Sequence, residues 1–90
     1  MSMKLLVLYR PNSEHARVIE TFLRDFQREY TGGLAVEVQS LDTREGASTA
    51  SIYDVVRYPG LLVLDNFGSV VRSWQGDELP QMAEIIGAAT

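Results

Sequence analysis

The chain has 90 residues, of which 46% are hydrophobic and 22% charged, and its formal net charge is −4. This composition is typical of a soluble globular protein, so we expect one domain over residues 1–90, cytoplasmic and monomeric by default. It gives no reason to expect nucleic acid or a membrane as a partner, and no apolar run approaches the roughly 20 residues of a membrane span. The absence of cysteine excludes disulfides and thiol nucleophiles.

The first predicted element is a strand, Lys4–Tyr9, because its sequence KLLVLY is almost continuously apolar. Runs of this kind are typical of a central strand that is covered on both faces. Over residues 13–30 the apolar positions recur every three or four residues instead, which predicts a helix packed on one side. Asn12 or Ser13 is expected to cap this helix, and Gly32-Gly33 is expected to end it.

The middle of the chain predicts two further strands. Leu34–Leu41 alternates between apolar and polar residues, which is typical of an edge strand with one solvated face. A loop over residues 42–51 and a short helical turn over residues 52–56 follow, and Pro59 ends this turn. Leu61–Leu64 is wholly apolar, so we expect it to be a second central strand.

The last third predicts a hairpin and a helix. The turn DNFG leads into a second edge strand, Ser69–Gln75, and the final helix spans about Glu78–Ala88 with Pro80 in its first turn. The order is therefore β-α-β-α-β-β-α. With the apolar strands inside and the mixed strands outside, it predicts a three-layer α/β fold with a four-stranded mixed sheet of order 2-1-3-4.

Two segments carry a resemblance to a known family that covers essentially the whole chain. They are DVVRYPGLLVLDNFGSVVRSWQG, residues 54–76, and YRPNSEHA, residues 9–16. Together with the order of elements, they resemble the thioredoxin-like superfamily in its small, glutaredoxin-sized form. The resemblance implies that Pro59 is the cis-proline of that fold, and a cis peptide bond is accessible essentially only before proline. It aligns Ser13 and Ala16 with the two cysteines of the family's Cys-x-x-Cys motif.

The same resemblance implies a scaffold without redox chemistry. In the family, the positive end of the first helix favours the thiolate of the first cysteine, whereas a serine hydroxyl is far too weak an acid to be ionised in this way. The strand Lys4–Tyr9 also lacks the buried carboxylate of thioredoxins, and Gly60 follows Pro59 where threonine is usual. Thiol–disulfide exchange at this site is therefore excluded.

The resemblance further implies that the residue before the cis-proline, Tyr58, pairs through its main chain with an extended peptide or a glutathione-like molecule. Arg10 and Arg57 are expected to lie beside it and, with the free amides of the first helix, to attract a carboxylate or phosphate. The alternatives are that Pro59 serves packing alone and that the arginines are only solvated. The candidate binding residues are Arg10, Asn12, Ser13, His15, Arg57, Tyr58 and Pro59.

We therefore expect a binding module that uses the cleft between Asn12–His15 and Arg57–Gly60, with no catalytic residue. His15 is the only histidine, so we expect neither a metal nor another cofactor. One alternative is an enzyme like the glutathione transferases that use serine in this region, which would require Ser13 and His15 to approach within about 3 Å. Another is assembly through an edge strand.

Overall fold

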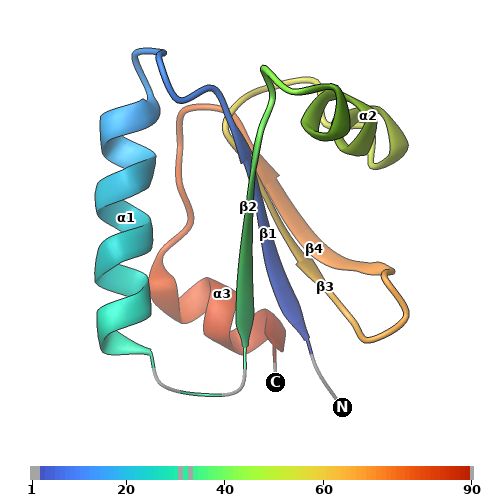
Figure 1. The fold of residues 1–90 in the computed structure, drawn as a ribbon. Coiled ribbons are helices and arrows are strands. Elements are labelled where there is room, and N and C mark those ends of the chain that lie inside the picture. Colours follow the sequence, from blue (N-terminus) through green and yellow to red (C-terminus); the bar gives the residue numbers. More distant parts are fainter. Residues whose placement is uncertain (1–2, 31, 33, 90) are drawn as a thin grey trace.

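A computed structural model of the chain describes residues 3–30, 32 and 34–89. Its elements are β1 (Lys4–Tyr9), α1 (Ala16–Glu29), β2 (Ala35–Ser40), α2 (Arg44–Ile52), β3 (Gly60–Leu64), β4 (Val70–Gln75) and α3 (Met82–Ala89) (Figure 1). The strands form one four-stranded sheet in the order β2-β1-β3-β4. Both the order of elements and the order of strands predicted from the sequence are confirmed.

The strand pairing decides where the ends of the elements meet. β1 runs parallel to β2 and antiparallel to β3, and β3 runs antiparallel to β4. Leu8, near the end of β1, lies opposite Gly60 at the start of β3. The loop that enters β3 is therefore brought beside the turn that leads from β1 into α1, although the two segments are far apart in the sequence.

The core is divided by the sheet into two parts, because successive side chains of a strand point to opposite faces. Leu5 and Val7 of β1 pack with residues of α1 and α3, whereas Leu6 and Leu8 pack with residues around α2. Figure 1 shows the same arrangement, with α1 and α3 on one face of the sheet and α2 on the other. All residues of β3 are buried, which explains why this central strand is continuously apolar in sequence.

The first helix begins later than predicted, and neither Asn12 nor Ser13 caps it. Its N-cap residue is His15, whose side chain makes no capping hydrogen bond. The hydroxyl of Ser13 instead donates to the carbonyl oxygen of Arg10 at 2.6 Å, which closes a turn ahead of the helix. The helix ends at Glu29, before the pair Gly32-Gly33 that was expected to end it. Residue 33 of this pair lies outside the described residues.

The prediction of a loop over residues 42–51 and a helical turn over residues 52–56 is wrong, because α2 occupies Arg44–Ile52. Only Gly46 and Ala50 of this helix are buried. The helix therefore lacks the apolar stripe on which the prediction depended. Of the apolar residues on which the predicted turn was based, Ile52 and Val56 are 72% and 75% exposed, whereas Val55 is buried.

Thr43 starts α2 by making two side-chain hydrogen bonds. Its Oγ1 accepts the main-chain N–H of Gly46 at 3.0 Å and donates to the carbonyl oxygen of Ser40 at 2.8 Å. Gly46 allows this close approach of helix and strand, because a Cβ atom at this position would overlap the Ser40 carbonyl oxygen. The helix is thus specified by its N-terminus.

Two smaller corrections concern the last helix and the edge strand β2. α3 begins at Met82, so Pro80 precedes the helix and does not occupy its first turn. Val38 lies on the same face as its β1 partner Val7 but is still 45% exposed, because β2 is at the edge of the sheet. Within the described residues, no helix is both long and apolar enough to span a membrane.

Candidate functional site

The turn between β1 and α1 is organised by the main chain of Arg10. The Arg10 N–H donates to Nε2 of His15 at 3.2 Å, and the Arg10 carbonyl oxygen accepts the Ser13 hydroxyl at 2.6 Å. Because Nε2 accepts this bond, the proton of the neutral imidazole lies on Nδ1. The Ser13 and His15 side chains, both within the described part of the chain, are thus bound to one residue's backbone and not to each other.

Tyr9 links the end of β1 to α1 below this turn. Its hydroxyl donates to Oε2 of Glu20 at 2.9 Å, and its ring centroid lies 6.3 Å from that of His15. Burial raises the pKa of Tyr9, and the hydrogen bond to Glu20 and the negative charge of this carboxylate raise the pKa further. The contact ties the N-terminal part of α1 to the end of β1.

The peptide bond between Tyr58 and Pro59 is cis, as the resemblance predicted. The carbonyl oxygen of Pro59 accepts the main-chain N–H of Gly76 at 3.1 Å. Gly76 has a φ angle of 100°, a conformation that suits glycine and few other residues. Gly76, the residue after β4, therefore holds the C-terminal end of the cis-proline loop at Pro59.

The entry of the same loop is held by the side chain of Gln75. Its Oε1 accepts the main-chain N–H groups of Val56 at 3.0 Å and of Arg57 at 3.2 Å. Its Nε2 lies 3.4 Å from the carbonyl oxygen of Asp54, to which it donates. Gln75, the last residue of β4, thus holds the main chain of the segment before Tyr58.

Tyr58 itself is anchored by its side chain and free along its main chain. Its side chain packs against the core on the α2 side, and the Arg10 guanidinium carbon lies 5.7 Å from the centre of its ring. Its main-chain N–H and C=O make no hydrogen bond to any other described residue. Main-chain groups in folded proteins are normally paired with protein or water, so this pair is open to a partner.

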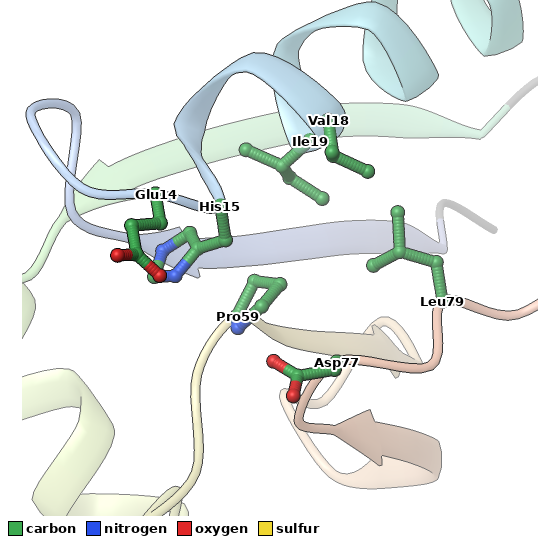
Figure 2. A pocket seen from close by; sticks show the side chains of 7 residues that line it. All are labelled: Glu14, His15, Val18, Ile19, Pro59, Asp77 and Leu79. Carbon is green, nitrogen blue, oxygen red and sulfur yellow. The ribbon is translucent and has the colours of Figure 1, made fainter.

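A cavity of about 370 Å³ lies beside this loop. Its lining residues are Glu14, His15, Val18, Ile19, Pro59, Asp77 and Leu79. Figure 2 shows His15 and Asp77 on either side of the Pro59 ring, with the aliphatic side chains of Val18, Ile19 and Leu79 above and beside it. The cavity therefore has an apolar wall and a polar rim.

The charges around this cavity differ from those expected from the sequence. Arg10 forms an ion pair with Asp42 at 2.8 Å, and the Arg57 guanidinium lies against Gly76, so neither arginine lines the cavity. The charged residues that do line it are the acids Glu14 and Asp77. Neither of them forms an ion pair with another described residue.

Comparison with solved structures gives strong matches over nearly the whole chain. A malarial protein matches with a TM-score of 0.76 and 16% identity, covering 98% of this chain and 93% of that one. Thioredoxin-2, a component of the malaria parasite protein secretion machinery, matches with a TM-score of 0.77 and 16% identity over 96% of this chain and 79% of its own. The chain has a thioredoxin-like fold.

The thioredoxin pre-protein of Schistosoma mansoni has the same fold, with a TM-score of 0.70 and 17% identity over 97% of this chain and 75% of its own. No family model and no curated protein matches the chain by sequence. The shared feature is therefore the thioredoxin-like fold. Since this chain has no cysteine, it has no thiol for thiol–disulfide exchange.

The thioredoxin-like fold brings together only part of the predicted site. His15 and Pro59 line the cavity and Tyr58 is next to it, whereas Asn12 is exposed in the preceding turn and Ser13 is bound to Arg10. Within the described residues, no group of three or more side chains is arranged to hold a metal ion.

Sequence reasoning missed the residues that complete the cavity wall. Glu14 lies in the turn before α1 and Val18 lies in the first turn of this helix, and both line the cavity. Val18 lies outside the buried stripe of the helix and is 58% exposed. An apolar residue at an exposed helix position could therefore have indicated a binding surface. Asp77 and Gln75 flank Gly76, the last residue of the segment 54–76 that carries the resemblance, but their roles follow from the strand pairing and not from a local pattern.

Proposed function

We propose that this thioredoxin-like domain is a non-redox binding module that holds an extended peptide at the cis-proline loop. The observation that carries the proposal is the main chain of Tyr58, whose N–H and C=O are unpaired among the described residues beside a cavity. An extended peptide supplies a complementary C=O and N–H, as a strand does when it adds to a sheet.

The surroundings of Tyr58 support this role because they hold its main chain in place. Gln75 fixes the residues before it, and Gly76 fixes the carbonyl oxygen of Pro59 after it. A loop that is already ordered loses little conformational entropy when a ligand binds. Pre-organisation of this kind suits a binding site that performs no chemistry.

The charges favour a peptide over a small anionic ligand such as glutathione. Arg10 is engaged by Asp42, and the acids Glu14 and Asp77 line the cavity. A carboxylate placed there would meet like charges, which disfavour binding. A transferase or hydrolase built on Ser13 and His15 has no support from the geometry, because both side chains are bonded to the Arg10 main chain.

The proposal is tested by titrating isotope-labelled protein with a short peptide, blocked at both ends, and following the amide signals by NMR. We expect the largest shifts at Tyr58 and in the segments 12–16 and 57–60. A matched peptide in which one amide is replaced by an ester lacks one N–H donor and should bind more weakly. Unchanged signals in both segments at millimolar peptide would refute the proposal, and a parallel titration with glutathione tests the anionic ligand.

A further inference from the structure

The cavity beside Pro59 offers more than space for a main chain. One wall of the cavity consists of the aliphatic side chains of Val18, Ile19 and Leu79 (Figure 2). The carboxylates of Glu14 and Asp77 also line the cavity. A group that fits this cavity must cover apolar surface and also satisfy negative charge. Neither a purely aliphatic nor an acidic group does both.

The two carboxylates are available to such a group. Glu14 and Asp77 are exposed, and neither has a hydrogen-bond or ion-pair partner among residues 3–30, 32 and 34–89. Arg57, whose guanidinium lies against Gly76, the residue before Asp77, forms no ion pair with Asp77. Among the described residues, no cationic side chain forms an ion pair with either acid.

We infer that the cavity receives a lysine or arginine side chain of the peptide bound at Tyr58. The long stem of such a side chain is apolar and its head is cationic, so it can lie along Val18 and Leu79 and place its charge near Glu14 and Asp77. This inference rests on the proposed function, because it needs the peptide main chain at Tyr58.

An extended peptide can place its main chain at Tyr58 and a side chain in the cavity at the same time. Successive side chains of a strand point in opposite directions. When the peptide main chain pairs with Tyr58, one side chain can enter the cavity next to Pro59 while its neighbours point away. One basic residue at a single position is therefore enough for recognition, and a glutamate at that position would meet like charge.

The test uses three short blocked peptides that differ only at the central residue, which is lysine, norleucine or glutamate. Norleucine keeps the aliphatic stem and removes the charge. We expect the lysine peptide to bind about three- to tenfold more tightly than the norleucine peptide at low salt, as exposed ion pairs allow. We expect the glutamate peptide to bind most weakly. Binding is followed by the amide shift of Tyr58 and by calorimetry.

A pair of variants separates the cavity from the overall charge of the protein. In Glu14→Gln with Asp77→Asn, the preference for lysine over norleucine should disappear, while norleucine binding stays close to that of the unmodified chain. The matched control is Glu29→Gln with Glu45→Gln, which changes the net charge equally but lies outside the cavity. This control should keep the full preference.

The outcomes distinguish the inference from the function on which it rests. If all three peptides shift Tyr58 with equal affinity, or if the control pair also loses the preference, the basic side chain is not recognised in the cavity and the inference fails while main-chain binding stands. If no peptide shifts Tyr58, both fail. A lysine preference that only the Glu14 and Asp77 pair abolishes supports both.

Discussion

Gln75 holds the main chain of Arg57: the carboxamide oxygen of Gln75 accepts the Arg57 N–H at 3.2 Å. The same oxygen accepts the N–H of Val56 at 3.0 Å. The last residue of β4 therefore determines how the cis-proline loop approaches the cavity.

Replacing Gln75 by alanine should loosen this loop. The two N–H groups that Gln75 binds would then depend on water, and we expect the free energy of unfolding to fall by about 1–2 kcal/mol. Urea unfolding measures this change, and faster hydrogen exchange at Val56 and Arg57 locates it. The control Gln27→Ala removes an exposed glutamine from α1. Equal stability of the two variants would show that the hydrogen bonds of Gln75 do not stabilise the loop.

Gly76→Ala should be destabilising because of the backbone conformation at this position. The φ angle is 100°, and a Cβ atom would lie 2.8 Å from Nη2 of Arg57. We expect a loss of about 1–3 kcal/mol. In the matched change Gly87→Ala, the new Cβ atom meets nothing within 4 Å apart from its chain neighbours and the backbone of its own helix α3, and the free energy of unfolding should rise by about 0.5–1 kcal/mol. Thermal unfolding of both variants checks that the first lowers the stability and the second raises it.

Thr43→Ala should shorten or weaken α2. Loss of the bond from the Gly46 N–H to Oγ1 removes the N-cap, at a cost of about 1 kcal/mol. Thr43→Ser keeps the hydroxyl and should recover most of this stability. Urea unfolding of the two variants gives the comparison. A serine variant as unstable as the alanine variant would mean that the methyl group, and not the cap, is what matters.

The raised pKa of Tyr9 predicts a loss of stability at high pH. The folded protein holds the Tyr9 proton more tightly than the unfolded chain, so the resulting stabilisation is complete below the unfolded pKa of tyrosine and is lost as the pH rises through the folded pKa. Glu20→Gln removes a negative charge and should lower the pKa of Tyr9, although burial still keeps it raised.

Tyrosinate absorbance during an alkaline titration measures this pKa, and Tyr9→Phe assigns the signal among the four tyrosines. An unchanged titration in Glu20→Gln would contradict a coupling between the two side chains. The stability difference between the natural chain and Tyr9→Phe should also narrow as the solution becomes alkaline.

The sheet could be predicted because its strands differ in burial. Leu61–Leu64 is buried on both faces and wholly apolar, whereas Val70–Gln75 at the edge mixes apolar and polar residues. The helix α2 could not be found in this way, since Ala50 is the only side chain it buries apart from the close approach at Gly46. Its signal is the cap at Thr43, which a search for apolar periodicity does not detect.

The candidate site shows the same contrast between local and long-range information. Pro59 was recognised from its own segment, and the cis bond is confirmed. Arg10 lies over the Tyr58 ring, in line with the expectation that it lies beside this residue, but it pairs with Asp42. Neither Arg10 nor Arg57 lines the cavity, which no local sequence pattern indicates. Asp77 entered the cavity through the pairing of β3 with β4.

The late start of α1 matters for any attempt to introduce reactive cysteines into this fold. Position 13 precedes the N-cap residue His15, so it lies ahead of the first-turn amides that stabilise a thiolate. A cysteine introduced at Ser13 would lie ahead of these amides, whereas one at Ala16 would be the first residue of the helix. The chain has no thiol, and its backbone also places residue 13 ahead of the N-cap of α1.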